Sequence, residues 1–358
     1  MTSKLKLLVA SSAVTLSLLG AMPAFAAGTA QGTSVLNNVS VDFQVAGVAQ
    51  TQRTASDTFV VDRKIIFTVA EAATTGTTSV APGQTAQVTR FQVTNTSNDT
   101  LDFSLAAVQQ ATTTAAAHGG TDAFDVTNFA YYVDANGNGI YEPGTDIATT
   151  IDNLLADQSR YVFIVGDIPL TATNGQVAGV TLSGTALNSN GTAITAATDA
   201  TANGAATVET IFADAVKSGV SGTSAARDGV DVANDDYTVA AAVLSVFKSS
   251  RIVSDGVSAT NPKAIPGAVV EYCISVANAT GGATATNINI SDIVPALTTY
   301  VASSILINAT VTSPGASQTC SAGAAGGTYT AGTTTVAGTL TNIAGGSASA
   351  LIFRATVN

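Results

Sequence analysis

The chain of 358 residues carries 24 acidic and 13 basic side chains, a formal net charge of −11. A strongly acidic chain without a basic cluster argues against nucleic acid and anionic membrane surfaces as partners. Charged residues make up only 10% of the chain and Trp is absent, so this Ala-, Thr-, Gly- and Val-rich composition favours strands and turns over helices.

The first 26 residues have the three parts of a secretory signal peptide. Lys4 and Lys6 form a basic start, an apolar stretch covers residues 7–21, and Ala24-Phe25-Ala26 is a typical cleavage site. We therefore predict a signal peptide at 1–26 and a secreted mature chain, extracellular or on the outer cell surface. The apolar stretch is shorter than the about 20 residues that a spanning helix needs, so no membrane span is expected in the mature chain.

Residues 27–62 are predicted to form an N-terminal β-hairpin. Its first strand alternates apolar and polar residues, the pattern of a strand with one buried face. The apolar positions are Val39, Val41, Phe43 and Val45. An isolated hairpin is marginally stable in water, so we expect it to dock. The simpler interpretation is that it completes the first sandwich of its own chain; the alternative is that it adds a strand to an open edge of a neighbouring copy.

A Pro-Gly turn followed by an alternating strand that ends at Asn occurs twice, at 82–95 and at 266–278. Residues two apart on a strand share a face, and the matching apolar positions are Phe91 and Val93 in the first copy and Ile274 and Val276 in the second. A second pair of similar segments, 153–165 and 342–353, follows the two copies. We therefore predict an all-β fold with two tandem Ig-like β-sandwich modules preceded by the N-terminal hairpin.

The domain boundaries follow from the strand signals between these repeats. Strands separated by Gly, Asn and Pro turns, with no convincing amphipathic helix, indicate sandwiches. We place a first β-sandwich at 63–213 and a second at 241–358. The polar, Gly-punctuated and acidic stretch at 214–240 is predicted to be a linker, with the alternative that the last edge strand of the first module falls inside it.

The second module resembles a known family in several spaced motifs. They are Lys263-Ala264-Ile265-Pro266-Gly267, Tyr272-Cys273-Ile274-Ser275-Val276-Ala277-Asn278, Asn287-Ile288-Asn289-Ile290-Ser291-Asp292-Ile293-Val294-Pro295 and Tyr300. Through them, residues 241–358 are similar to the bacterial conserved-repeat domain family, number eleven among the domains of unknown function. The resemblance implies an Ig-like module of an exported or cell-surface protein, and it supplies no catalytic residues. Ala277 departs from the family pattern, in which a polar residue precedes the Asn.

Cys273 and Cys320 are the two cysteines of the chain, and in an exported protein they are expected to form a disulfide. A closed loop of about 47 residues would stabilise the fold by about 4 kcal/mol in the chain-entropy model. Cys273 alternates against the face that carries Tyr272 and Ile274. The bond is therefore predicted to clamp a covering loop and not to lie in the sandwich centre.

The segment 134–146 is a candidate calcium site. Ca²⁺ takes six to eight oxygen ligands, and the spacing D-x-N-x-N-G places three side-chain oxygens around a tight turn that Gly permits. The candidate ligands are Asp134, Asn136, Asn138, Ile140, Glu142 and Asp146. Thr145 stands where a calcium loop has its bidentate Glu. The alternative is a plain hairpin turn, since Asn-Gly occurs twice directly after a strand signal.

No enzymatic activity is expected. His118 is the only histidine, and it is predicted to be an exposed loop residue, so a catalytic triad or His-based zinc catalysis lacks its parts. We predict a non-enzymatic structural or adhesive surface protein. Its expected partners are further copies of itself or other surface components, and a more specific hypothesis is that its copies assemble by strand addition. The alternative is a carbohydrate- or ligand-binding surface module, for which Tyr131, Tyr132 and Tyr141 are the candidate aromatic platform.

Overall fold

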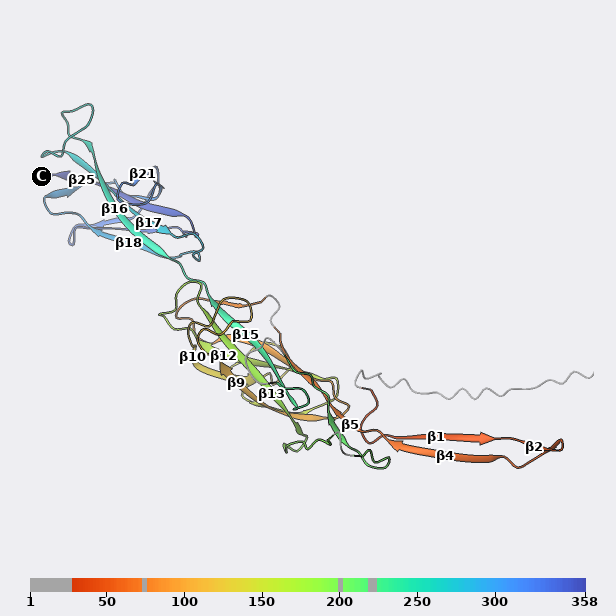
Figure 1. Cartoon of the computed structure of the whole chain (residues 1–358). Coiled ribbons are helices and arrows are strands. Elements are labelled where there is room, and N and C mark those ends of the chain that lie inside the picture. The colour runs from red at the N-terminus through yellow and green to blue at the C-terminus, as the bar shows by residue number, and fades with distance from the viewer. Residues whose placement is uncertain (1–27, 73–75, 199–201, 218–223) are drawn as a thin grey trace, which may run out of the picture.

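The computed structural model describes residues 28–72, 76–198, 202–217 and 224–358, so the predicted signal peptide lies outside the described residues. In these ranges the chain forms strands, turns and loops and no helix, and hence none long and apolar enough to cross a membrane. Figure 1 shows an elongated arrangement in which a hairpin, a first sandwich and a second sandwich follow one another in chain order. The predicted all-β fold with two sandwich modules after a hairpin is confirmed.

The hairpin is an antiparallel ribbon that projects from the first sandwich (Figure 1). Its strands are β1 (Ser34–Val41) and β4 (Arg53–Val60), with β2 (Gln44–Val45) and β3 (Val48–Ala49) at the tip. β1 and β4 pair only with each other in the described part of the chain, and Val39 and Val41 are 54% and 52% exposed. The interpretation that the hairpin completes the first sandwich is therefore wrong, because neither of its outer edges reaches a strand of that body.

The first sandwich packs a four-stranded sheet against a five-stranded sheet. Its strands are β5 (Arg63–Ile65), β6 (Phe67–Glu71), β7 (Thr78–Val80), β8 (Gln87–Asn95), β9 (Leu101–Gln109), β10 (Thr127–Val133), β11 (Thr150–Leu154), β12 (Ser159–Asp167), β13 (Val177–Asn188), β14 (Thr210–Phe212) and β15 (Val230–Val239). The sheet orders are β10-β12-β8-β6 and β11-β9-β13-β15-β7, and β14 pairs with β5. Phe91 and Phe103, one from each sheet, are fully buried in one core.

The acidic stretch predicted as a linker, 214–240, contributes a strand to the first sandwich. β15 pairs with β13 on one side and in parallel with β7 on the other. Tyr237 is fully buried, and its hydroxyl donates a hydrogen bond to the Ile164 carbonyl at 3.0 Å. The polar pattern of the stretch was misleading because several of its carboxylates are buried in the body. Asp231, for example, accepts the Val69 N–H at 2.7 Å and the Lys217 ammonium at 2.9 Å.

The second sandwich follows after the short connection 240–243. Its strands are β16 (Leu244–Ser254), β17 (Val269–Asn278), β18 (Ile288–Ile293), β19 (Thr298–Tyr300), β20 (Leu306–Thr312), β21 (Thr319–Ser321), β22 (Ala324–Ala325), β23 (Thr328–Thr330), β24 (Thr335–Leu340) and β25 (Ala348–Val357). A sheet of order β16-β17-β25-β20-β21, joined by β19 and β22, faces a sheet of order β18-β24-β23. Ile274 and Val276 lie in the core between them.

Both sandwiches contain the same buried asparagine at the end of the repeated strand. Asn95 ends β8 and Asn278 ends β17, and they are 0% and 2% exposed. The Asn95 amide donates to the Leu154 carbonyl at 2.9 Å, and the Asn278 amide donates to the Ile343 carbonyl at 3.0 Å. Each of these amides also donates to a carbonyl of the loop that follows its strand. We call this side chain with its partners the asparagine anchor.

The backbone around the asparagine anchor also repeats. The Asn95 carbonyl accepts the Asp157 N–H at 2.8 Å, and the Asn278 carbonyl accepts the Gly346 N–H at 2.9 Å. The Pro-Gly turns match as well, since Gly83 and Gly267 have φ of 80° and 89°, in the left-handed region that glycine tolerates. The two sequence echoes therefore lie at equivalent places in the two sandwiches, with the second echo supplying one of the two carbonyls that each anchor binds.

Removing an anchor should destabilise its sandwich. In an Asn278→Ala variant the carbonyls of Ala283 and Ile343 and the Val243 N–H lose their side-chain partner, and unsatisfied buried groups of this kind cost about 1–3 kcal/mol. Calorimetry of the mature chain should show a lower melting temperature for the second sandwich. Asn289→Ala, at an exposed position of β18, is the matched control, and equal melting of the two variants would contradict the anchor's role.

Candidate functional site

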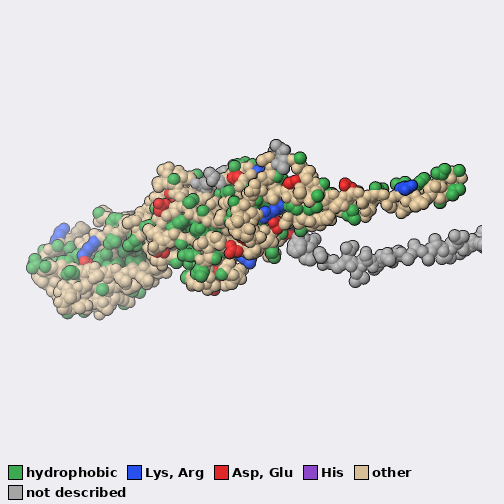
Figure 2. Space-filling model, turned by 90° about the horizontal axis from the view of Figure 1, so that it is seen from below, with side chains coloured by type: hydrophobic (Ala, Val, Ile, Leu, Met, Phe, Trp, Pro, Cys, Tyr) green, Lys and Arg blue, Asp and Glu red, His purple; other side chains and the backbone are tan. Residues whose placement is uncertain are grey.

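The hairpin presents an apolar face to solvent. In its register, Val35 lies opposite Phe59 and Val39 lies opposite Ala55, so these residues point to the same side of the ribbon. Phe59 is 50% exposed, and hydrophobic side chains also gather at the tip (Figure 2). A two-stranded ribbon with an uncovered apolar face is a site for association.

The second sandwich has a complementary feature, an open side at β16. In the described part of the chain, β16 pairs with β17 alone and therefore has a free outer edge. Val246 lies opposite the buried Val276 and so faces the interior side of its sheet. Val246 is nevertheless 66% exposed and Leu244 is 45% exposed, because the facing sheet ends at β18 and does not extend over β16.

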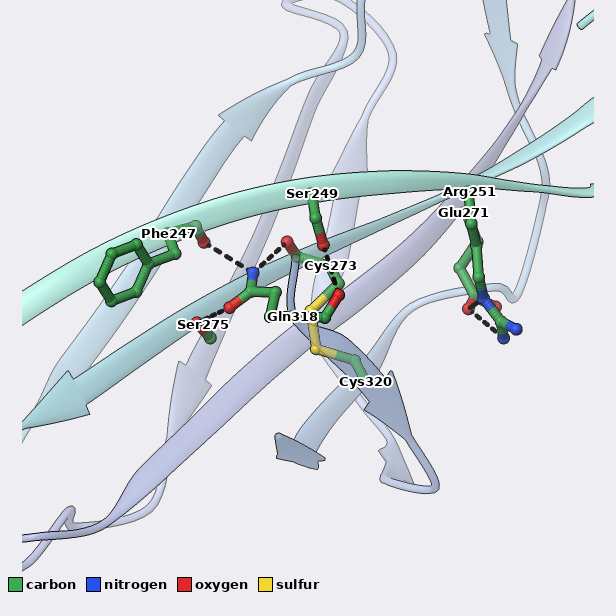
Figure 3. The surroundings of a disulfide bond; sticks show 8 residues. All are labelled: Phe247, Ser249, Arg251, Glu271, Cys273, Ser275, Gln318 and Cys320. Atoms are coloured by element: carbon green, nitrogen blue, oxygen red, sulfur yellow. Dashed lines mark hydrogen bonds and ion pairs between the residues drawn. A yellow bond between two sulfur atoms is a disulfide. The ribbon is translucent and has the colours of Figure 1, made fainter. Parts of the chain in front are cut away.

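The disulfide joins Cys273 to Cys320, with a Cα–Cα distance of 5.9 Å. Figure 3 shows it beside Gln318, on the face of β17 away from the main core. The Gln318 amide donates to the carbonyls of Phe247 and Cys273 at 3.2 and 3.1 Å, and its side-chain oxygen accepts the Ser275 hydroxyl. The cysteines pack in a cluster of their own, so the bond clamps a covering segment as the strand parity predicts.

The predicted calcium segment forms a tight loop closed by its own hydrogen bonds. Asp134 is 1% exposed; its Oδ1 accepts the Gly137 N–H at 2.7 Å and its Oδ2 accepts the Gly139 N–H at 2.7 Å. Asp146 closes the other side by accepting the N–H groups of Ala135 and Glu142 at 2.9 and 2.7 Å. Both buried carboxylates therefore already stabilise the turn.

The remaining candidate ligands meet at the mouth of this loop. The side-chain amides of Asn136 and Asn138 both donate to Glu142 Oε2, at 2.6 and 3.1 Å. Ile140 is 65% exposed, and its N–H donates to the Asn138 side-chain oxygen. The structure brings the six predicted residues together. The amide hydrogens of Asn136 and Asn138 point to the Glu142 carboxylate, whereas calcium would need oxygen atoms to point to it. Calcium binding therefore stays a prediction.

The three tyrosines of the ligand-binding alternative do not form a flat exposed platform. The Tyr131 hydroxyl donates to the Leu105 carbonyl at 2.8 Å, and its ring packs against the first core. Tyr132 and Tyr141 stack on each other with ring centroids 5.5 Å apart. Tyr141 also lines a groove of about 600 Å³ together with Arg90 and Phe163, which is the one feature here that favours a small ligand.

His118 lies in a cluster that the sequence did not predict. Its side chain is 25% exposed, and its Nε2 lies 2.9 Å from a Glu71 oxygen and 3.5 Å from Asp235 Oδ1. The three residues come from different strands and loops that are distant in sequence, so no spacing motif relates them. His118 is an exposed loop residue, as predicted. The sequence did not show that the connection between β9 and β10 folds back onto β15 and brings its imidazole to Glu71 and Asp235.

No family model and no curated protein sequence matches the chain, so the resemblance to the conserved-repeat family stays a prediction. Among solved structures, the chain is similar to the C-terminal domain of the AgI/II polypeptide BspA of Streptococcus agalactiae, at 9% identity over 82% of this chain and 91% of that chain, with a TM-score of 0.32. It is also similar to the collagen adhesin of S. aureus, at 10% identity over 83% and 84% of the two chains, with a TM-score of 0.22. A putative membrane anchored protein of Corynebacterium diphtheriae has 9% identity over 91% and 89%, with a TM-score of 0.20.

Asp235 should make the stability of the first sandwich depend on pH. Burial raises the pKa of this carboxyl from 3.8 to about 7, and the charges of Glu71 and Asp236 act in the same direction, while the Asp236 N–H and His118 oppose them. Between about pH 4 and pH 7 the folded chain then holds a proton that the unfolded chain has released, so stability falls as the pH rises, by at most about 1.4 kcal/mol per pH unit.

Urea unfolding across this range, with a chelator present, measures the dependence. Subtracting the result for Asp235→Asn, which cannot titrate, isolates the contribution of this carboxyl from those of Glu71, His118 and Asp236. A difference between the two proteins that stays constant from pH 4.5 to 7.5 would show that Asp235 titrates normally in the fold.

Proposed function

We propose that the protein is an exported, non-enzymatic structural component of the cell surface whose copies assemble head to tail through the hairpin. The observation that carries this proposal is the projecting hairpin with its uncovered apolar face. Val39, Val41 and Phe59 share this face and are 54%, 52% and 50% exposed, although burying such side chains stabilises a protein by about 1.5–3 kcal/mol each. An isolated ribbon of this kind gains its stability from a partner.

The partner that fits is the open side of a second copy. β16 has 11 residues and a free edge, whereas β1 and β4 have eight each, so either hairpin strand can pair with β16 along its full length. Strand addition of this kind satisfies edge N–H and C=O groups and places apolar side chains in the uncovered part of the core. Val246 and Leu244 would then lie under hairpin residues.

The hairpin projects from one end of the molecule, and the first sandwich separates it from β16, which begins at the joint between the two sandwiches (Figure 1). One copy therefore cannot satisfy both within itself, and the contact joins two different surfaces. A heterologous contact that does not close into a ring produces an open filament. Head-to-tail addition thus predicts fibres and not a closed dimer.

The joint between the sandwiches suits a stiff filament subunit. Only residues 240–243 separate β15 from β16, and their backbone is bonded to both bodies. The Ala241 N–H donates to the side chain of Asn174 in the first sandwich at 2.8 Å, and the Ala241 carbonyl accepts the Ala283 N–H of the second at 2.9 Å. Relative motion is the default for two domains without a large apolar interface, and we infer that this short connection, hydrogen-bonded to both bodies, reduces it.

Assembly can be tested with the mature chain and its variants by light scattering and electron microscopy. The wild type should form filaments or a concentration-dependent series of oligomers, and Val41→Asp on the hairpin or Val246→Asp on β16 should each give monomers. Val257→Asp, at an 81% exposed position of the second sandwich outside its strands, is the matched control and should assemble like the wild type.

Mixing the two monomeric variants gives a sharper result. Val41→Asp keeps an intact β16 edge and Val246→Asp keeps an intact hairpin, so a mixture should form one-to-one dimers and no fibres. A wild type that remains a strict monomer at all concentrations, or assembly that survives both substitutions, would overturn the proposed interface.

We also propose that the loop 134–146 binds calcium and thereby stiffens the first sandwich. A ligand that binds only the folded state raises the melting temperature, so millimolar calcium should raise it relative to a chelator. The difference should vanish in Asp134→Ala and persist in Asp152→Ala, which removes an exposed carboxylate of β11. An equal melting temperature with calcium and with chelator would leave the segment as a turn closed by its own hydrogen bonds.

A further inference from the structure

A group of acidic side chains surrounds the single histidine of the chain inside the first sandwich. Glu71 ends β6, Asp235 and Asp236 lie in β15, and His118 comes from the connection between β9 and β10. His118 Nε2 lies 2.9 Å from Glu71 Oε2 and 3.5 Å from Asp235 Oδ1. One ligand atom from each of Glu71, His118 and Asp235 lies within 4.8 Å of the other two.

The carboxylates of β15 are buried without full hydrogen bonding. Asp235 and Asp236 are both 0% exposed. Among the described residues, Asp235 Oδ2 and Asp236 Oδ1 have no hydrogen-bond partner. Buried polar atoms are nearly always paired, and a buried anionic oxygen without a partner is especially costly. The other oxygen of Asp235, Oδ1, accepts the Asp236 N–H at 2.7 Å and lies 3.5 Å from His118 Nε2.

The charge of the group is also unbalanced. Glu71, Asp235 and Asp236 supply three carboxylates, and within the described ranges the imidazole of His118 is the one basic side chain that forms an ion pair with Glu71 and Asp235. The backbone holds this arrangement in place, because the His118 N–H donates to Asp236 Oδ2 at 2.8 Å. Like charges at this distance repel unless a cation or a proton lies between them.

We propose that Glu71, His118 and Asp235 bind one divalent transition-metal ion of the zinc type. An imidazole nitrogen with two carboxylate oxygens is a ligand set that suits Zn²⁺, whereas calcium and magnesium prefer oxygen ligands alone. Tetrahedral bonds of about 2.0–2.1 Å place ligand atoms about 3.4 Å apart. The observed separations of 2.9 and 3.5 Å lie close to this value, so small side-chain shifts admit the ion.

The ion would have a structural effect on this part of the sandwich. It would tie the end of β6, the β9–β10 connection and β15 together, and it would supply a positive partner to the buried carboxylate of Asp235. A structural role of this kind is independent of the calcium loop and of the proposed head-to-tail assembly.

The single histidine makes the site directly observable. In the tag-free mature chain, the imidazole ring protons of His118 give the only histidine signal in the NMR spectrum. Titration with zinc chloride should shift this signal saturably at one ion per chain, and zinc at about 100 times its dissociation constant should raise the melting temperature by about 5 °C.

Conservative variants test the ligands one at a time. Calorimetric titration should show at least about a tenfold loss of zinc affinity in Glu71→Gln, Asp235→Asn and His118→Gln. Glu71→Gln changes a partly exposed side chain and so tests the site without altering the core. Asp125→Asn, an exposed carboxylate of the same connection, is the control and should bind zinc like the wild type.

Two results would overturn the proposal. One is a His118 signal that does not change at any zinc concentration below the millimolar range. The other is a zinc-dependent shift of the same affinity in the wild type, Glu71→Gln and Asp235→Asn, which would mean that the exposed part of the imidazole binds zinc alone and that no built site exists.

Discussion

The asparagine anchor is the interaction on which both sandwiches depend. At the end of β8 and of β17 the chain leaves one sheet and crosses to the other, and the carbonyls of Asp99 and Ala283 in these crossings are partly buried. The amide of Asn95 or Asn278 has two N–H donors and one oxygen, which match two carbonyls and one N–H at each site. Satisfying these groups fixes the distance between the two sheets at the point where the strand order changes.

Free strand edges are the second constraint, and they connect the fold to its proposed role. In the second sandwich, β16 is the end strand of one sheet and β18 is the end strand of the facing sheet. The apolar side chains of β16 that β18 does not cover are exposed to solvent, and so is the apolar face of the hairpin. Natural sheets protect such edges with charges, bulges or partners. Here Lys248 and Asp292 form a 2.6 Å ion pair across the open side, but the strip at Leu244 and Val246 stays exposed, which is why a second copy is the fitting occupant.

Charged groups behave differently in the two bodies. In the second sandwich, Glu271 is buried but receives Arg251 and Arg354, so its charge is compensated within the protein. In the first, Asp235 and Asp236 are equally buried and each keeps an oxygen without a described partner. The buried charge of Glu271 is therefore balanced by two arginines, whereas the buried carboxylates of β15 are not fully paired. For this reason β15 is the part of the chain where we place a bound cation.

The sequence by itself determined the all-β class, the hairpin, the two related modules and the position of the disulfide, because these depend on local alternation and on residues that recur at equal spacing. The main interpretation of 214–240 as a linker was wrong, and the alternative with a strand of the first module inside it was nearer to the structure. The acidic residues of β15 look like a solvated linker until Lys217 and the Val69 N–H are seen beside Asp231. The sequence also predicted that the six candidate calcium ligands lie close together, because all of them belong to the one short segment 134–146. Only the tertiary structure decided that the hairpin stands free and that His118 meets Glu71 and Asp235, because both outcomes depend on which distant segments pack together, and no local pattern encodes that.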